Sequence, residues 1–160
     1  MTGIVIRRAT NADLPDVIRL RSLSTHEQDG DVQDDGFDDR FAAWFAGESS
    51  RRITWLAEAD GRAVGMMNLA VFDRMPRPGQ PPSRWGYLGN AFVLADYRNQ
   101  GIGGRLIGAL LEYADENDFA RVVLSPSQRS IPFYERAGFV PADALLLRTP
   151  GDGRSAGTSR

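Results

Sequence analysis

Apolar residues recur with two different periods along the chain, and these periods predict short strands and short helices. Residues 4–9 are apolar enough to form a first strand. Thr10 and Asp13 then fit a capping box, and the apolar positions that follow keep a helical spacing to about Leu23. A second helix is expected over residues 37–45, where an aromatic stripe favours packing into the core.

The middle of the chain has the pattern of extended strands. Residues 53–59 and 63–72 read as a hairpin, because they flank Asp60-Gly61, a favoured pair for a tight turn. A proline-rich loop over residues 73–84 follows, and a further strand is expected at residues 85–94. The hairpin predicts antiparallel pairing in this part of the sheet.

The second half of the chain adds a strand–helix–strand unit. Apolar side chains line one face of a helix that starts near residue 101, and a short buried strand is expected at residues 121–124. Such a crossover makes its two strands parallel. A short helix at residues 130–137 then ends at Gly138, and a last strand is expected at residues 143–148.

The order of these elements predicts a mixed α+β fold with a central sheet, in one domain that covers residues 1–148. The chain has 160 residues, of which 42% are hydrophobic and 25% charged, and this suffices for one globular domain with its own core. The Gly-, Ser- and Arg-rich tail from Thr149 onward is expected to be frayed.

Scarce residue types exclude several kinds of chemistry. The absence of cysteine removes disulfides, thiolate zinc sites and acyl-cysteine intermediates. All 19 basic residues are arginine, so a Walker-type phosphate loop and a pyridoxal-phosphate Schiff base are excluded. His26 is the single histidine, and no G-x-S-x-G elbow accompanies it. We expect chemistry without a metal, carried by carboxylates, tyrosine, backbone amides and water.

Charge and hydropathy restrict the partners and the location. The net charge of −2 and the pI of about 5.4 give no electrostatic case for nucleic acid. The N-terminus lacks an apolar signal core, and no apolar run approaches the length of a membrane span. We therefore expect a cytoplasmic protein that binds neither nucleic acid nor membrane.

Three glycines stand where the helix near residue 101 begins. The first N–H groups of a helix have no intrahelical partners, the helix dipole is positive there, and glycines let an anion approach the backbone closely. Gly101, Gly103 and Gly104 can supply this access, and Arg98 and Arg105 flank the turn. The spacing differs from the dinucleotide-binding pattern, and glycines for close helix–sheet packing explain it equally well.

Two motifs decide between these interpretations. The glycine segment reads Arg98-x-x-Gly101-x-Gly103 after an expected strand, and FYERAGF follows at residues 133–139. This combination resembles the GNAT superfamily of acyl-CoA-dependent N-acetyltransferases, across nearly the whole chain and in the order of the elements. The resemblance implies a mostly antiparallel, splayed central sheet of 6–7 strands, flanked by about four helices.

The resemblance also implies where acetyl-CoA binds. In this family the strand before the glycine turn splays from its neighbour at a bulge, its freed backbone pairs with pantetheine, and the turn holds the pyrophosphate. The residues of this chain that match these positions are Phe92, Val93, Leu94, Arg98, Asn99, Gln100, Gly101, Ile102, Gly103, Gly104, Arg105, Ser127 and Tyr134.

Two groups inherit a catalytic role from the resemblance. The backbone N–H of Val93 matches an amide that faces the thioester carbonyl, and it is expected to stabilise the oxyanion. Tyr134 matches a tyrosine beside the CoA sulfur. Its phenol is protonated at neutral pH and is expected to act as the general acid for the departing thiolate. Without cysteine, we expect direct attack by the amine in a ternary complex.

The chain departs from the family pattern at two positions. Ser127 stands where relatives often have an asparagine that contacts the cofactor, and Asn90 stands where many have the basic glutamate. The general base is therefore unassigned, and Glu58, Asp73 and His26 are candidates by residue type alone.

The acceptor is expected to be a primary amine of a small molecule or peptide. Family members build this site from the region between the first two helices and from the loop before the splayed strand, here residues 24–39 and 73–85. The first region carries seven acidic residues, which either attract a cationic amine or form a solvated loop. Phe72 and Trp85 are candidates for an apolar wall or for core packing.

Other functions remain compatible with the sequence. A catalytically lapsed acyl-CoA-binding module would keep the cofactor motifs without turnover, and a nucleotide-binding module would use the glycine turn alone. A homodimer is expected only by analogy with the family.

Overall fold

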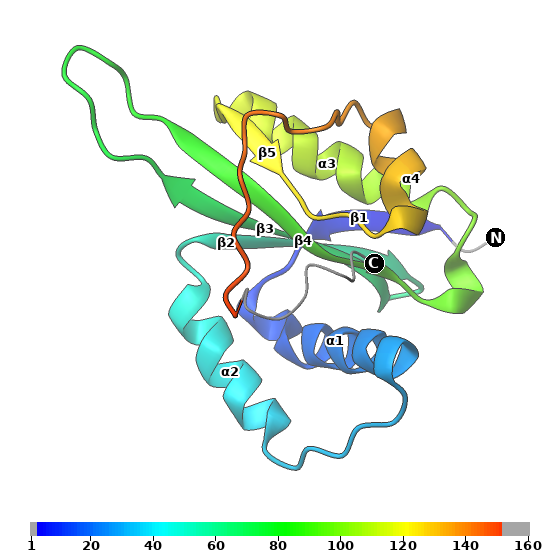
Figure 1. Cartoon of the computed structure of the whole chain (residues 1–160). Helices are drawn as coiled ribbons and strands as arrows, with labels where there is room; N and C mark the ends of the chain where they lie inside the picture. The colour runs from blue at the N-terminus through cyan, green and yellow to red at the C-terminus, as the bar shows by residue number, and fades with distance from the viewer. Residues whose placement is uncertain (1–2, 152–160) are drawn as a thin grey trace.

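A five-stranded sheet forms the centre of the computed structural model, which describes residues 3–151 (Figure 1). The strands lie in the sheet in the order of the chain, the first four antiparallel and the last parallel to the fourth. They are β1 (Ile4–Arg8), β2 (Arg52–Ala59), β3 (Arg62–Asp73), β4 (Arg84–Val93) and β5 (Arg121–Val123). The parallel pair follows from the helix that connects β4 to β5.

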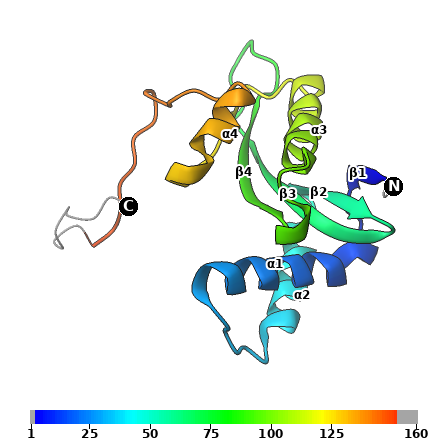
Figure 2. The same ribbon diagram turned by 90° about the vertical axis from the view of Figure 1, so that its right-hand side faces the viewer.

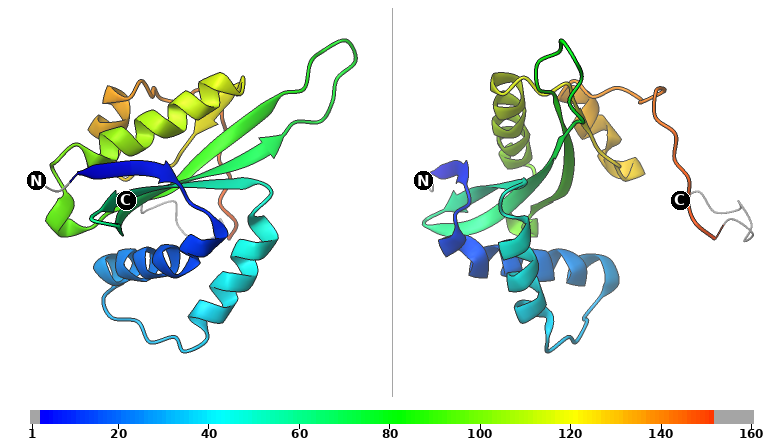
Figure 3. Two further views of the ribbon diagram at one scale, coloured as in Figure 1. Left: turned by 180° about the vertical axis from the view of Figure 1, so that it is seen from behind. Right: turned by 90° about the vertical axis from the view of Figure 1, so that its left-hand side faces the viewer.

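Helices cover both faces of this sheet (Figures 2 and 3). One face carries α3 (Ile102–Glu116) and α4 (Ile131–Arg136), and the other carries α1 (Leu14–Asp29) and α2 (Phe37–Glu48). Single 3₁₀ turns lie at Asn11–Asp13, Ala95–Tyr97 and Gln128–Ser130. Because both faces are covered, nearly every residue of β3 between its ends is buried.

Two apolar clusters, one on each face, hold these layers together. The larger lies under α3, where Leu106 and Leu110 are fully buried against the sheet. The smaller lies under α1, where Val17 and Leu20 pack against Leu56 and other sheet residues. The helical spacing of these residues places them on one side of each helix.

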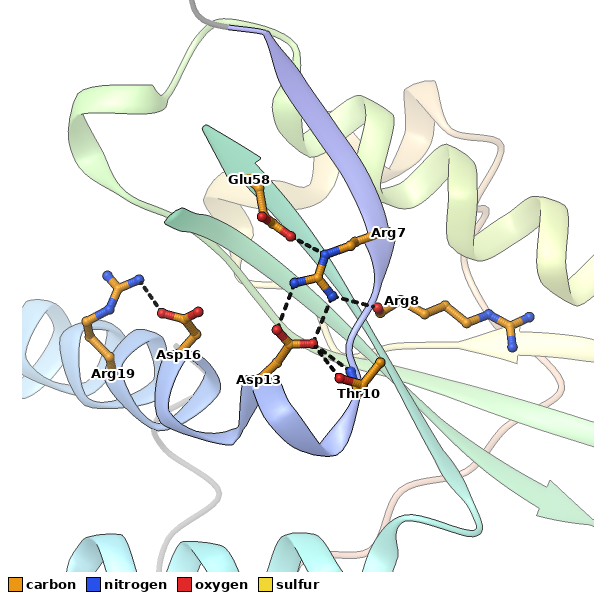
Figure 4. Close-up of polar contacts among 7 residues, drawn as sticks. All are labelled: Arg7, Arg8, Thr10, Asp13, Asp16, Arg19 and Glu58. Carbon is orange, nitrogen blue, oxygen red and sulfur yellow. Dashed lines mark hydrogen bonds and ion pairs between the residues drawn. The ribbon is translucent and has the colours of Figure 1, made fainter. Parts of the chain in front are cut away.

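An ion-pair cluster fastens the start of α1 to the edge of the sheet (Figure 4). The Asp13 carboxylate is 7% exposed and accepts hydrogen bonds from two Arg7 guanidinium nitrogens at 2.7 and 2.8 Å, and from the Thr10 N–H at 2.6 Å. Arg7 also donates from Nε to Glu58 on β2. The Arg7 guanidinium holds the pKa of Asp13 well below its usual range. The expected capping box is confirmed here.

The mostly antiparallel sheet and the four helices agree with the expectation, but the strand count does not. The sheet has five strands instead of six or seven, and the expected strand at residues 143–148 is wrong. Leu146 and Leu147 are 100% and 91% exposed, and no described strand pairs with their backbone. A strand forms only where a neighbour accepts its backbone hydrogen bonds, and apolar pattern alone does not provide one.

Two helices differ from their expected form. The first continues past Leu23 to Asp29 and ends at Gly30, whose φ of 80° breaks the helix. The aromatic stripe of α2 reaches the core through Phe41, which is partly buried against the cluster under α1, although no residue of α2 is fully buried. The centroid of the Phe41 ring also lies 5.3 Å from that of Trp44 and 6.3 Å from that of Phe45.

The remaining expectations concern the extent of the chain. That residues 1–148 form one domain stays a prediction, and most of the tail expected to be frayed lies outside the described residues. Within residues 3–151, no helix is long and apolar enough to cross a membrane.

Candidate functional site

A β-bulge interrupts β4 two-thirds of the way along the strand. Asn68 of β3 pairs with Gly89 and Met66 pairs with Phe92, so Asn90 and Ala91 together face one residue of β3. Asn90 adopts a left-handed conformation with φ of 53°, which asparagine tolerates better than most residues. The bulge predicted from the resemblance is therefore present.

On the side of β4 away from β3, β5 pairs only with the first part of β4, and no strand of residues 3–151 pairs with the rest. Parallel pairing ends where Tyr87 faces Val123. Further along β4, the Leu94 N–H donates to Val64 O on β3 at 2.8 Å. Because successive N–H groups of a strand point to opposite sides, the Val93 N–H points away from β3 toward this unpaired side. The expected splay thus leaves a backbone donor at Val93.

The glycine turn ends at the start of α3. Gly101 is the N-cap, with φ of 79° and no side-chain cap, and the first N–H that returns to it belongs to Arg105, at 3.1 Å from Gly101 O. The N–H groups of Ile102, Gly103 and Gly104 therefore have no intrahelical partner. Together with the helix dipole, these free donors have the chemistry that an anionic group needs, and the expected pyrophosphate site stays a prediction.

The other two glycines have different surroundings, so both the packing interpretation and the backbone-access interpretation of the motif apply. A Cβ on Gly103 would lie 3.3 Å from the Phe133 ring, so this glycine allows α4 to pack closely against α3. A Cβ on Gly104 would meet nothing within 4 Å, so this position opens onto solvent. Packing explains one glycine, and access to the backbone agrees with the other.

A cavity of about 470 Å³ lies in front of this turn. Val93, Arg98 and Asn99 line it together with the three glycines, and Phe133 and Arg136 of α4 close it from the other side. Ile102 is buried in the core, so only its backbone N–H can contribute. The structure brings the strand end, the glycine turn and the FYERAGF helix around one space, as expected.

The two arginines expected at the pyrophosphate are engaged elsewhere. Arg98 donates to both carboxylate oxygens of Glu27 at 2.7 Å and to Val93 O at 2.9 Å, and Arg105 donates to Ile4 O at 2.9 Å. Arg136, which the sequence analysis did not single out, lines the cavity. Its position three residues after Phe133, on the same face of α4, was the available signal.

Tyr134 does not line that cavity, although its neighbour Phe133 does. It lines a second cavity instead. Its side chain is 9% exposed, and its ring makes edge contacts with Phe133 and Phe139 at 5.0 and 5.8 Å. The second cavity, of about 360 Å³, separates Tyr134 from β5. Burial raises the pKa of the Tyr134 phenol, so the hydroxyl stays protonated at neutral pH.

The remaining expected cofactor residues have individual placements. Phe92 packs toward α1, with the Arg98 guanidinium 5.6 Å from its ring, while Leu94 contacts both apolar clusters. Gln100 donates to Asp96 O at 3.2 Å. Ser127 donates to the Ser130 hydroxyl at 3.0 Å, at the start of the turn before α4. Cofactor contacts by these side chains stay predictions.

The opposite face of the sheet carries a cavity of about 230 Å³ between α1, α2 and the bulge. Val17 and Met66 form its apolar floor, and Phe41, Trp44 and Phe45 form a wall on α2. Its polar lining consists of Arg21, Thr54, Asn68 and Asn90. Asn68 and Thr54 are buried and bonded to each other at 2.7 Å. A smaller cavity of about 190 Å³ adjoins it and shares Trp44, Phe45, Thr54 and Asn68.

None of the three candidate bases lines the cavities beside β4. Glu58 is bound by Arg7 at the β1–β2 edge, Asp73 is exposed at the end of β3, and His26 lies in the last turn of α1. The loop between β3 and β4 projects away from the bulge and from both helices of the lower face (Figure 1). Residues 73–85 do not line these cavities, and their role in an acceptor site stays a prediction.

This arrangement suits transfer of an acyl group between two ligands. One cavity offers backbone donors for an anionic cofactor, and the other lies across the sheet at the same bulge. No cluster of His, Cys, Asp or Glu able to hold a metal occurs in residues 3–151.

Similar proteins agree with this interpretation. A curated relative, glucosamine 6-phosphate N-acetyltransferase of Trypanosoma brucei brucei, is 34% identical over 79 residues. The match covers 49% of this chain and 52% of the relative, so this chain spans about half the length of that protein.

Solved structures share the fold over almost the whole chain. A predicted acetyltransferase of Clostridium acetobutylicum, solved with acetyl-CoA, superposes with a TM-score of 0.75 at 21% identity and covers 92% of this chain and 96% of its own. A GCN5-related N-acetyltransferase of Ralstonia eutropha JMP134 superposes with a TM-score of 0.71 at 25% identity, over 93% of this chain and 100% of its own.

The sequence model of the acetyltransferase (GNAT) family matches residues 17–139, from the first helix to the end of the FYERAGF motif. This range contains the bulge, the glycine turn and α4, the elements that surround the cavities. The chain belongs to the GNAT family of acetyltransferases.

Proposed function

We propose that this protein is an N-acetyltransferase that moves the acetyl group of acetyl-CoA to a primary amine by direct attack in a ternary complex. The observation that carries the proposal is that two sets of free backbone N–H groups lie beside the same cavity. The Val93 N–H points to the unpaired side of β4, and the first N–H groups of α3 face the adjoining cavity. A thioester and a pyrophosphate need donors of these two kinds.

The cofactor would lie along β4 and end at α3. Pantetheine amides pair with the backbone of Phe92, Val93 and Leu94, and the pyrophosphate lies on the turn from Arg98 to Arg105. Arg136 lines the same cavity and supplies a guanidinium that arginine can offer to a phosphate in bidentate form. Arg98 can join only after it exchanges its bond to Glu27 for one to phosphate.

Two groups would then assist the transfer: the Val93 N–H just after the bulge and the Tyr134 hydroxyl on α4. The amine nitrogen attacks the thioester carbonyl, a C–N bond forms, and the Val93 N–H stabilises the oxyanion. The C–S bond breaks as Tyr134 donates its proton to the CoA thiolate, and the phenolate recovers a proton from water. The nitrogen loses one proton to solvent, so the products are the acetamide and free CoA.

The acceptor amine would enter from the opposite face, through the cavity between α1 and α2. Asn90 lines this cavity, and it lies three residues before Val93 on the same strand. Among the described residues of this cavity there is no carboxylate or imidazole, so the general base stays unassigned. The apolar wall favours the neutral form of a bound amine, which is the form that attacks. The amine acceptor of the trypanosome relative, glucosamine 6-phosphate, supports this class of substrate.

Two measurements test the proposal against its alternatives. Acetyl-CoA is expected to raise the melting temperature more than ATP or NAD does, and release of free CoA is expected with at least one primary amine. Stabilisation by acetyl-CoA without turnover of any amine would establish the lapsed acyl-CoA-binding module. Stabilisation by ATP or NAD in place of acetyl-CoA would establish a nucleotide-binding module.

We also propose that two copies associate through the C-terminal segment, in the cytoplasm. The exposed Leu146 and Leu147 have the pattern of a strand, and the outer edge of β5 pairs with no strand in residues 3–151. In a dimer, the segment with Leu146 and Leu147 of one copy would pair with the outer edge of β5 of the other, because an unpaired edge accepts an added strand. Light scattering after gel filtration is expected to give the mass of a dimer, and a monomer after Leu146→Ser with Leu147→Ser. A monomeric wild-type chain would refute this assembly.

A further inference from the structure

The cavity between α1, α2 and the bulge contains one charged group that nothing in the described structure neutralises. Arg21 lies one turn after the buried Val17 on α1, and both residues line this cavity. The Arg21 side chain is half-buried, and within residues 3–151 its guanidinium makes no hydrogen bond or ion pair. A guanidinium carries five donors and stays charged at any physiological pH, so a partly buried one favours an anionic partner.

Several arginines near this cavity are neutralised by carboxylates of the chain, whereas Arg21 is not. Arginines on α1, on α2, at the start of β2 and in the turn before α3 bind carboxylates of the chain. These include Arg19 with Asp16, Arg40 with Asp34, Arg52 with Glu48 and Arg98 with Glu27. Arg21 is left with free donors toward the cavity, where a bidentate carboxylate or phosphate matches their geometry.

The acidic residues between the first two helices do not supply that partner. Glu27 is bound by Arg98 and Asp34 by Arg40, and neither lines the cavity. Glu48 lines only the adjoining smaller cavity, where Arg51 and Arg52 hold it at 3.0 and 2.8 Å. The charge that faces the cavity is therefore positive, and a cationic acceptor finds no counter-ion there.

The rest of the lining indicates the body of the ligand. Three aromatic rings of α2 stand on one side, and Met66 and Val17 form the floor. Trp44 stays 40% exposed although the Arg52 guanidinium lies 4.9 Å from its ring. Exposed aromatic surface inside a cavity is typical of a site for an apolar or aromatic ligand, oriented by a few polar groups.

We propose that Arg21 selects the acceptor, and that the acceptor is a primary amine on an apolar or aromatic body that carries an anionic group. The anionic group, a carboxylate or a phosphate, binds the Arg21 guanidinium, and the amine lies toward Asn90 and the thioester. This inference rests on the proposed acetyl transfer. Arg21 is a specificity residue, and it takes no part in the bond changes at the thioester.

A panel of matched amines tests the proposal by CoA release. L-phenylalanine and L-phenylalaninamide differ in one carboxylate, O-phosphotyramine and tyramine differ in one phosphate on an aromatic body, and spermidine is the cationic arm. We expect the anionic member of at least one pair to have the higher kcat/KM, by about ten-fold or more. The pair that shows this preference distinguishes a carboxylate from a phosphate.

The variant Arg21→Met keeps the stem of the side chain and removes the charge. It is expected to raise KM for the preferred anionic amine by about ten- to a hundred-fold, with kcat little changed, and to leave its uncharged counterpart unaffected. Arg21→Lys should restore part of the loss. Arg77→Met, in the β3–β4 loop away from both cavities, is the matched control and should behave as wild type.

The outcomes separate this inference from the function on which it rests. Turnover of uncharged or cationic amines at least as fast as anionic ones, unchanged by Arg21→Met, would overturn the inference and leave acetyl transfer intact. No CoA release above the amine-free background with any amine would overturn both. The melting temperature and its rise with acetyl-CoA should be the same in Arg21→Met and wild type, which excludes general unfolding as the cause.

Discussion

The two faces of the sheet carry the two halves of the candidate site, and they are built in different ways. On the α3–α4 face, the cavity is formed by residues between Val93 and Ala137, and its donors are mostly backbone N–H groups. On the α1–α2 face, the cavity takes side chains from both helices and from three strands. One half uses local backbone geometry that a short motif can encode, whereas the other uses side chains that only the fold brings together.

This difference has a consequence for evolution of the two halves. Backbone donors depend little on side-chain identity, so we expect the α3–α4 face to tolerate many side-chain substitutions. Glycines are the exception, because their conformation and small size keep the backbone accessible. Side chains set the shape and charge of the acceptor face, and one substitution such as that of Arg21 changes its preference. Family membership therefore predicts the donor of the acyl group better than the acceptor.

The largest expected effect breaks the cofactor face alone. A Cβ at Gly104 meets no atom within 4 Å, and Gly104→Asp places a negative charge in the first turn of α3, where the dipole tolerates it. We expect an unchanged melting temperature and a loss of acetyl-CoA affinity of about a hundred-fold or more, because the carboxylate repels the pyrophosphate. Calorimetric titration with acetyl-CoA measures this.

Gly108→Asp is the matched control for that experiment. Gly108 lies one turn further along α3, and a Cβ there also meets nothing within 4 Å. It should keep the affinity of wild type. Equal losses in both variants, or none in Gly104→Asp, would contradict a pyrophosphate site at the start of α3.

A smaller effect is expected at Tyr134 of α4, in the wall of the second cavity of the α3–α4 face. Tyr134→Phe removes one hydroxyl and keeps the ring contacts, so folding and acetyl-CoA affinity should stay as in wild type. We expect kcat to fall about ten- to a hundred-fold if the phenol protonates the thiolate. Steady-state CoA release with a saturating amine measures kcat. Tyr113→Phe, on α3 away from the cavities, serves as control, and an unchanged kcat in Tyr134→Phe would rule out the acid role.

The smallest expected effect loosens the acceptor face. Asp13→Asn removes the carboxylate that Arg7 binds, at the point where α1 meets the sheet. We expect a loss of about 2 kcal/mol in the free energy of unfolding at pH 7. This corresponds to a fall of roughly 4–8 °C in melting temperature. Urea titration at pH 7 measures it, and the acceptor KM should rise more than the dissociation constant of acetyl-CoA.

The pH dependence of the same pair provides a second readout. The pKa of Asp13 is lowered in the folded state, so its contribution to stability is present above the unfolded pKa of about 4 and is lost as the pH falls below it. The gap in stability between wild type and Asp13→Asn should therefore narrow as the pH is lowered through that range. A gap that stays constant down to pH 2 would show that the ion pair does not cause it.

Much of the fold could be predicted because periodicity reports burial on one side. The hairpin at Asp60-Gly61, the helix after Gly101 and the stop at Gly138 all appear where local chemistry placed them. The strand expected at residues 143–148 failed since strand formation depends on a partner that periodicity does not reveal. The stripe on α2 agrees with the prediction only in part, because Phe41 packs against the core while Phe41, Trp44 and Phe45 also line a cavity.

The sequence by itself determined the proposed acyl-CoA half of the site, from the glycine turn to FYERAGF, because glycine conformation and free N–H groups at a helix start are properties of adjacent residues. Only the tertiary structure decided the proposed acceptor half. In the folded chain Arg7 binds Glu58 and Asp13, and Arg98 binds Glu27. Arg21 lies beside the aromatic wall of α2 without a carboxylate partner among the described residues. Which charges cancel and which remain depends on distances between residues far apart in the chain, and no local pattern contains those distances.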